Sequence, residues 1–296
     1  MKSIFVSAVS ALALLLVGCV TVPNLQEQAR AELFKQLRES TSWQRIHAAE
    51  ELCKAGILSP EITSIYESEY LASPAKDPYR VGCIRVLYRN CPEKRNALRA
   101  ELLSIAFDRG CPGDAHAAET IGKLGIIMSP DELEHMRPYL AKDDALGSYA
   151  ILPFVFVADP EVMPLWKERV EKRNNNAVGI GTYVEELPEE CSEVFRAARF
   201  DRGADEWFRV FSFGSYLRHC RISNADYYEL WRRIEEEGPS VRRFYLNSVG
   251  DIGSERDAEK LRKYLEDEDG ENRIAAAGSI LRIANRCALI PARRDI

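Results

Sequence analysis

A short motif, proline followed at once by an acidic residue, constrains the fold of this chain more than any other feature. Proline is well tolerated at the first position of a helix, and an acid beside it meets the positive end of the helix dipole. Each copy therefore predicts a helix start. The copies recur roughly every 30 residues, a period typical of repeat proteins, as Ser59-Pro60-Glu61, Cys91-Pro92-Glu93, Ser129-Pro130-Asp131, Asp159-Pro160-Glu161 and Leu187-Pro188-Glu189.

A second helix between successive starts is predicted from two segments that resemble each other. His47 to Ile57 reads HAAEELCKAGI and His116 to Ile126 reads HAAETIGKLGI, and each leads into the next proline-acid motif. The chain is therefore predicted to form about eight helix pairs. Their first helices begin near Asn24, Pro60, Pro92, Pro130, Pro160, Pro188, Asn224 and Ser254. Their second helices begin near Ser42, Asp77, Asp114, Asp144, Asn176, Asp205, Ser240 and Gly270.

Several second helices share an arginine followed by small residues and a leucine-like residue. This pattern resembles the second helix of HEAT-type repeats, with the arginine at Arg45, Arg80, Arg209, Arg242 and Arg273. The resemblance covers residues 24–290 and implies an all-α fold, a right-handed αα superhelix (HEAT-like solenoid). A tetratricopeptide-like array and an irregular helical domain are the alternatives. The resemblance to HEAT-type repeats also implies that the repeated arginine bonds a ladder of aspartates, such as Asp77 or Asp269.

The weakest helix prediction falls on residues 174–187. Three successive asparagines, Asn174 to Asn176, and the nearby Gly179 and Gly181 disfavour a helix there. We expect a short or irregular element in this segment and a bend of the array near it.

The N-terminus predicts export and lipid attachment. Residues 1–18 have the dimensions of a signal-peptide core rather than of a membrane span. The segment Leu16-Val17-Gly18-Cys19 resembles the bacterial lipoprotein box, which implies that Cys19 becomes the lipidated N-terminus and that residues 19–23 form a tether. The alternative is an ordinary secretory signal that happens to end at a cysteine. The residue after the cysteine is Val20, and in this the motif is similar to that of lipoproteins kept in the outer membrane, facing the periplasm.

The charge balance limits the classes of partner. The chain has 46 acidic and 40 basic residues and a net charge of −6. This balance argues against a nucleic-acid binder, and it leaves attachment to the membrane to the lipid. We expect a protein or peptide partner instead.

The candidate partner site lies on the second helices of the last repeats. Second helices line the concave side in HEAT-like arrays, and here they carry arginines and aromatic residues. Arginines outside the repeat register are the better candidates for ligand contact. We therefore predict a binding surface that suits an acidic partner segment or an anionic glycan, formed by Arg85, Arg218 and Arg243 with Tyr216 and Tyr245.

Cysteines and histidines give weaker signals. Cys53 with Cys91, and Cys191 with Cys220, are candidate disulfides, with buried free thiols as the alternative. The pairs His47/Glu50 and His116/Glu119 each share a helix face. The two sites should stand too far apart for a common metal centre, so no metal site and no cofactor is predicted.

These observations favour a membrane-anchored lipoprotein that acts as a binding scaffold. An enzyme or enzyme subunit on HEAT-like repeats, and an architectural spacer, are the alternatives. A closed pocket of clustered Asp, His or Glu would favour an enzyme, an open basic and aromatic groove a binder, and a featureless polar face a spacer.

Overall fold

The computed structural model describes residues 24–184, 187–201 and 203–289, so the predicted signal peptide and lipid tether lie outside the described residues. Every regular element within these ranges is a helix. The all-α prediction is confirmed, and so are the eight helix pairs.

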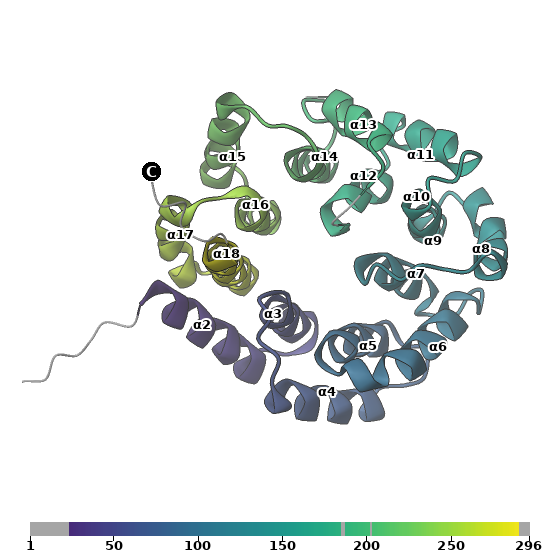
Figure 1. Cartoon of the computed structure of the whole chain (residues 1–296), viewed down its shortest axis with the longest axis horizontal. Helices are drawn as coiled ribbons and strands as arrows, with labels where there is room; N and C mark the ends of the chain where they lie inside the picture. The colour runs from purple at the N-terminus through teal and green to yellow at the C-terminus, as the bar shows by residue number, and fades with distance from the viewer. Residues whose placement is uncertain (1–23, 185–186, 202, 290–296) are drawn as a thin grey trace, which may run out of the picture.

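One helix of each pair lies on the outside of the molecule (Figure 1). The outer elements are α2 (Leu25–Glu39), α4 (Pro60–Ala72), η1 (Pro92–Lys94) with α6 (Arg95–Ala106), α8 (Pro130–Met136) with η2 (Arg137–Ala141), α11 (Val162–Glu171), α13 (Glu190–Ala198), α15 (Asn224–Glu236), and α17 (Glu255–Leu261) with η3 (Arg262–Glu266).

The inner elements surround the centre. They are α3 (Ser42–Lys54), α5 (Pro78–Asn90), α7 (Asp114–Lys123), α9 (Ala145–Tyr149) with α10 (Leu152–Phe156), α12 (Asn175–Tyr183), α14 (Glu206–His219), α16 (Pro239–Ile252) and α18 (Gly270–Leu289).

Local capping explains where many of these helices begin. The Ser59 hydroxyl accepts hydrogen bonds from the N–H groups of Glu61 and Ile62, and Ser129 forms a capping box with Glu132. Asp144 and Asp205 cap α9 and α14 in the same way. Each cap satisfies backbone N–H groups that a helix start leaves unpaired, so the sequence signals have a direct physical cause.

The array of helix pairs closes into a ring. The last inner helix, α18, packs against α2 and α3 of the first pair as well as against its neighbour α16 (Figure 1). The concave face of the predicted solenoid is therefore the wall of a central lumen. We call the contact between α18 and the first pair the seam.

The seam repeats the contact that joins neighbouring pairs. Arg80 donates to the carbonyl groups of Tyr70 and Ser73 in its own pair and forms an ion pair with Glu101 of the next pair at 2.8 Å. Arg273 likewise donates to the carbonyl groups of Asp267 and Glu268 and pairs with Glu32 of the first pair at 2.9 Å.

Arg45 and Arg242 follow the same scheme, pairing with Glu69 and Asp267 of the following pairs. The predicted aspartate ladder was wrong in its partners. Asp77 and Asp269 instead accept backbone N–H groups at the starts of their own helices, at 2.8 and 2.7 Å. Four of the five repeat-register arginines therefore hold successive pairs together, whereas Arg209 donates to the carbonyl group of Ala204 in its own pair at 2.9 Å.

The segment predicted to hold a short or irregular element forms a short helix, α12 (Asn175–Tyr183), of nine residues. The Asn174 side chain caps it by accepting the N–H of Ala177 at 2.9 Å. Gly181 is needed for close packing, because a Cβ atom there would come within 2.5 Å of both Phe195 and Ser215. Gly181 thus lets α12 approach its neighbours, whereas a Cβ atom at Gly179 would make ordinary contact with Phe211 at 3.7 Å.

Candidate functional site: the central lumen

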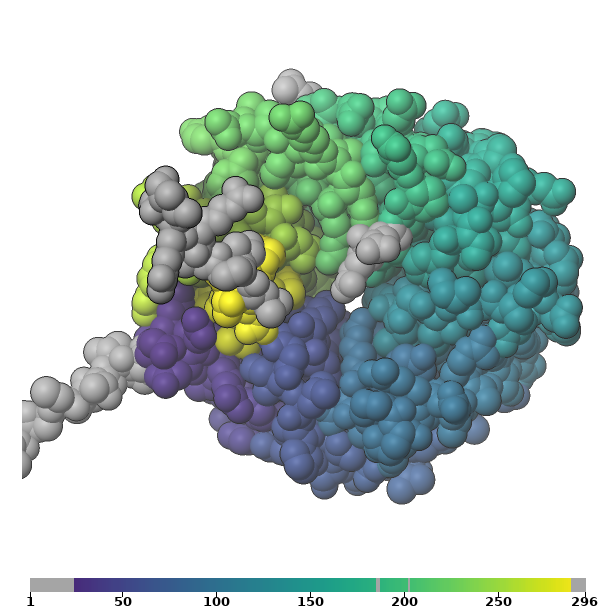
Figure 2. Space-filling view, viewed as in Figure 1, coloured from purple at the N-terminus to yellow at the C-terminus, as the bar shows by residue number. Residues whose placement is uncertain are grey.

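The inner helices enclose a cavity of about 1340 Å³. The face of the ring seen in the space-filling view is hollowed near its centre (Figure 2). Sites for drug-sized ligands measure roughly 300–1000 Å³. The lumen is therefore large enough for a ligand of that size or for a short stretch of polypeptide.

Cations gather at one end of the lumen. Four inner helices, α3, α5, α7 and α14, each place a basic residue in their last turn, where the negative end of the helix dipole favours a cation. These residues all line the cavity, and we call them the cation layer: Lys54, Arg89, Lys123 and Arg218.

The members of the cation layer come from different sides of the ring but act on one another. Lys54 bonds Glu51, and Glu51 bonds Arg282 of α18. Arg282 and Arg218 both lie beside Asp251 in the last turn of α16, at 3.6 and 3.1 Å. The inner helices therefore end at a similar level along the axis of the lumen.

Aromatic rings gather at the other end. The indole of Trp43 stacks on His116 with ring centroids 5.4 Å apart. Elsewhere in the lumen wall, Phe244 lies edge-on to Trp207 and Phe211 at 5.7 and 5.1 Å. All five residues line the cavity and occur early in their helices, and we call them the aromatic layer.

A glycine makes room for part of this layer. A Cβ atom at Gly82 of α5 would lie 3.1 Å from the Trp43 ring and 2.4 Å from Ile46. The bare backbone of α5 therefore lets Trp43 of α3 pack across it and reach His116 of α7.

Between the two layers lies a buried ion pair. Arg85 is 1% exposed and bonds the Glu50 carboxylate, and its Nη1 donates to the Thr120 hydroxyl at 3.1 Å. Burial raises the pKa of Glu50, but Arg85, Arg89 and Lys123 outweigh it and hold that pKa below its usual range. The Glu50 carboxylate is therefore charged and structural.

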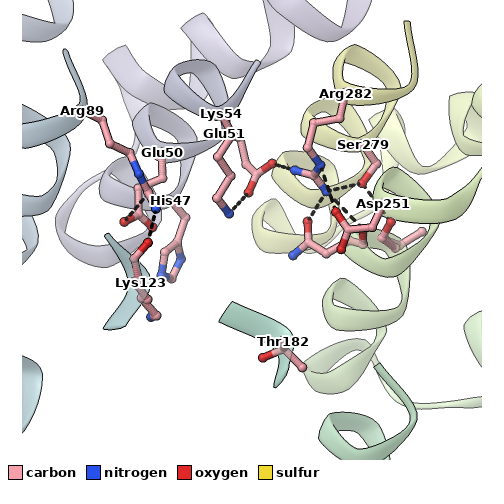
Figure 3. Close-up of polar contacts among 12 residues, drawn as sticks. His47, Glu50, Glu51, Lys54, Arg89, Lys123, Thr182, Asp251, Ser279 and Arg282 are labelled. Atoms are coloured by element: carbon pink, nitrogen blue, oxygen red, sulfur yellow. Dashed lines mark hydrogen bonds and ion pairs between the residues drawn. The ribbon is translucent and has the colours of Figure 1, made fainter. Parts of the chain in front are cut away.

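The carboxylate of Glu51 links the lumen to the seam. It accepts a hydrogen bond from the Lys54 ammonium at 2.7 Å and another from the Arg282 guanidinium (Figure 3). Arg282 also donates to the carbonyl group of Asn247 at 3.1 Å and lies 3.6 Å from Asp251. One guanidinium thus joins α18 to both α3 and α16.

Basic residues exceed acidic ones in the cavity wall, although the chain as a whole is acidic. The acidic lining residues are Glu50, Glu51, Glu119, Asp251 and Glu271. The basic ones are Lys54, Arg85, Arg89, Arg95, Lys123, Arg218, Arg243 and Arg282. The wall therefore favours an anionic ligand.

Enclosure by the ring shifts the pKa values of ionisable side chains in the lumen. The Lys54 side chain is 42% exposed, but it lines the cavity rather than the outer surface. Burial, followed by the charge of Arg89, lowers the pKa of Lys54 to about 8. Burial also raises the pKa of Asp251, against the opposing charges of Arg218 and Lys54.

The structure places the predicted arginines in the wall of the lumen but separates them. Arg218 belongs to the cation layer, where it pairs with Asp251 at 3.1 Å and donates to the carbonyl group of Thr182 at 2.8 Å. Arg243 lies nearer the aromatic layer, where it pairs with Glu271 at 3.1 Å and covers the Phe244 ring. The third predicted arginine, Arg85, is buried in the Glu50 pair.

The predicted tyrosines do not reach the lumen. Tyr216 is 4% exposed and donates its hydroxyl to Asp226 at 2.9 Å, and the Tyr245 hydroxyl accepts a hydrogen bond from Arg233 at 3.2 Å. Both partners lie on the outer helix α15. Tyr216 is two residues from Arg218, and Tyr245 is two residues from Arg243. Side chains at that spacing do not share a helix face.

The lysines of the lumen were missed in the sequence, and Glu50 and Glu119 were considered there only as partners of His47 and His116. The signal that would have found them is the pair of similar segments beginning at His47 and His116. Glu50 and Glu119 occupy equivalent positions there, and so do Lys54 and Lys123. The spacing puts each glutamate and lysine on one helix face, as in the ion pair between Glu119 and Lys123 at 2.9 Å.

The seven described cysteines are free thiols, so neither predicted disulfide is present in the structure. The Cys220 thiol donates to the carbonyl group of Ser192 at 3.3 Å instead. Burial raises the pKa of Cys53 and of Cys191 to about 12, which keeps both as protonated thiols of low reactivity.

The two histidines of the predicted histidine–glutamate pairs, His47 and His116, do not share a site. Nδ1 of His47 lies 2.8 Å from the Glu271 carboxylate across the seam, whereas His116 stacks on Trp43. Among the residues that the structure describes, no group of three or more His, Cys, Asp and Glu side chains could hold a metal ion.

None of the described helices combines the length and the apolar character that a membrane span requires. In comparisons with known proteins, no family model matches the chain and no curated protein matches it. The lumen and the N-terminal motif therefore carry the functional argument.

Proposed function

We propose that the protein is a lipid-anchored lipoprotein that binds an acidic segment of a partner protein in the lumen of its ring. The observation that carries this proposal is the excess of basic residues in the cavity wall of an acidic chain. In a partly enclosed site such cations attract an anionic ligand more strongly than they would on the outer surface. The lipid at Cys19 would hold the ring at the outer membrane, facing the periplasm.

The lumen suits binding better than it suits catalysis. Although the cavity is enclosed and contains clustered acids, these acids are held by cations: Glu50 by Arg85, Glu119 by Lys123, Asp251 by Arg218 and Glu271 by Arg243. A carboxylate held in this way is a weak candidate for a general base. The mixed basic and aromatic wall also differs from the featureless polar face expected of a spacer.

Binding can be tested with a fluorescein-labelled hexaglutamate peptide and the full-length protein in detergent, with fluorescence anisotropy as the readout. The variant is Lys54→Gln with Arg89→Gln. Glu51 keeps Arg282 and Glu50 keeps Arg85 in this variant, so the fold retains its buried pairs. We expect affinity to fall about tenfold or more, since hydrogen bonds to charged groups contribute roughly 1.5–3 kcal/mol each.

A matched control removes the same charge from outside the lumen. Lys172, directly after α11, and Arg38 on α2 have side chains that are 71% and 59% exposed. Lys172→Gln with Arg38→Gln should leave peptide binding unchanged. The proposal would be contradicted if both double variants lost the same affinity for the peptide, or if the wild-type protein did not bind it.

The same titration has a distinct pH dependence. Lys54 faces Arg89, Arg218, Glu50, Glu51 and Asp251, and its pKa is lowered to about 8. The ammonium is charged below that pH and neutral above it. Peptide affinity should therefore fall as the pH rises from 7 to 9, and Lys54→Gln should remove this step. Added salt should also weaken binding.

The anchor is tested separately. Cys19→Ser removes the thiol that the lipoprotein motif would modify, so we expect the protein to appear soluble or unprocessed in the envelope fraction. Membrane fractionation with mass spectrometry of the N-terminus measures both outcomes. A substituted protein that is still processed and still held in the membrane by a detergent-sensitive lipid would exclude the motif.

A further inference from the structure

The two ends of the lumen differ in chemistry, and they do so on the same helices. Two residues of the aromatic layer each precede a residue of the cation layer by seven positions, His116 before Lys123 in α7 and Phe211 before Arg218 in α14. His47 and Lys54 of α3 show the same spacing. Residues seven apart lie two turns along one face of a helix.

This spacing gives the lumen a polarity and a length. Seven residues at 1.5 Å each separate the levels of Phe211 and Arg218 by roughly 10 Å along the axis. Trp43 and Trp207 stand eleven positions before Lys54 and Arg218, one turn further from the cation layer, but the Trp207 ring packs 6.0 Å from the Phe211 ring. The layers hold their levels around the ring. Trp43 of α3 meets His116 of α7 at one level, and at the other Lys54 of α3 is linked to Arg218 of α14 through ion pairs of Glu51, Arg282 and Asp251.

We infer that the lumen is a two-part site for an extended peptide in which an aromatic or large aliphatic residue stands about three positions from a pair of acidic residues. An extended chain advances roughly 3.3 Å per residue, so three residues cover the distance between the layers. The carboxylates would lie among Lys54, Arg89 and Arg218, and the apolar residue against Trp207 and Phe244. This inference rests on the proposed function and specifies its ligand.

The aromatic layer has surface to offer such a residue. Trp207 is 37% exposed although it packs against Phe211 and Phe244. A planar ring exposed at the wall of a cavity binds apolar and aromatic groups through stacking and burial of area. The Glu271 carboxylate near this end already pairs with His47 and Arg243, so it has partners without the ligand. Its negative charge would repel the ligand's carboxylates.

Three synthetic peptides of equal length test the inference against the full-length protein. The first has phenylalanine three positions before two glutamates, the second has serine in place of the phenylalanine, and the third has the phenylalanine directly beside the glutamates. We expect the first to bind about tenfold more tightly than the other two, because only it reaches both layers. Isothermal titration calorimetry gives the three affinities.

A pair of protein variants locates the effect. Trp207→Ser should remove most of the advantage of the first peptide over the second. Tyr228→Ser, on the outer helix α15 and 75% exposed, is the matched control and should keep that advantage. Circular dichroism before titration checks that both variants are folded.

The outcomes separate this inference from the proposed function. If hexaglutamate binds but the three peptides bind equally, or if Trp207→Ser keeps the advantage, the two-part site is wrong while the anionic site stands. If no acidic peptide binds the wild-type protein, both proposals fail. Tighter binding of the first peptide that depends on Trp207 supports both.

Discussion

An Arg85→Met variant is expected to lose about 3–5 kcal/mol of unfolding free energy. Arg85 is 1% exposed, and its removal leaves the buried Glu50 carboxylate with Arg89 at 3.6 Å as its nearest remaining cation. Breaking a buried ion pair by removing one partner costs this much because the other charge stays in a medium that solvates it poorly. Thr120 loses a hydrogen-bond donor as well. Urea unfolding followed by circular dichroism measures the change.

The double variant Arg85→Met with Glu50→Gln is the matched control. It removes both charges, so most of the stability should return, even though one cation and one anion are gone from the lumen wall. A double variant as unstable as the single one would mean that Arg85 acts through its packing and not through Glu50. The pH dependence gives a second check. The pKa of Glu50 lies below its usual range, so the stability that its charge provides should be lost as the pH falls through the acid range.

An Arg282→Glu variant is expected to open the ring. Arg282 bonds Glu51 of α3, the carbonyl group of Asn247 of α16, and lies 3.6 Å from Asp251. A glutamate would place three carboxylates together at the seam, and like charges at close range in an enclosed site repel strongly. We expect a loss of about 3 kcal/mol or more from the buried position.

Native-state hydrogen exchange distinguishes an open ring from a generally weakened one. Amide groups of α2 and α18 should exchange faster in Arg282→Glu, whereas those of α7 on the far side should change little. Arg221→Glu, on an exposed position outside the lumen, makes the same charge change and should not affect α2 or α18. Uniformly faster exchange around the ring would show that Arg282 supports the whole core and not the seam.

Local signals in the sequence predicted the helices well because local physics sets their ends. Ser59, Ser129 and Asp205 cap helices with their own side chains, so the residues that mark each start also stabilise it. The shared arginine was predicted to bond aspartates such as Asp77 and Asp269, which lie at the starts of its own helices. Its carboxylate partners were missed because they lie on the next outer helix, and the sequence pattern within one helix does not contain that information.

Ring closure could not be read from the sequence. It depends on a small rotation between successive pairs that adds up over the whole chain, and it joins residues as distant as Glu32 and Arg273. The prediction of the candidate site was incomplete for the same reason. The expectation of an open concave surface favoured the last repeats with Tyr216 and Tyr245. In the closed ring, Lys54 of the first repeat is instead linked to Arg218 through ion pairs of Glu51, Arg282 and Asp251.

Closure also bears on how such a chain can change in evolution. In an open solenoid each repeat contacts its neighbours alone, so repeats can be gained or lost at little cost to the others. Here Arg273 meets Glu32, and Gly278 lets α18 approach Glu51 so closely that a Cβ atom would lie 2.2 Å from the carboxylate. One pair more or fewer would misalign both contacts. The copy number of this array is therefore fixed by geometry, as the number of blades is in a β-propeller.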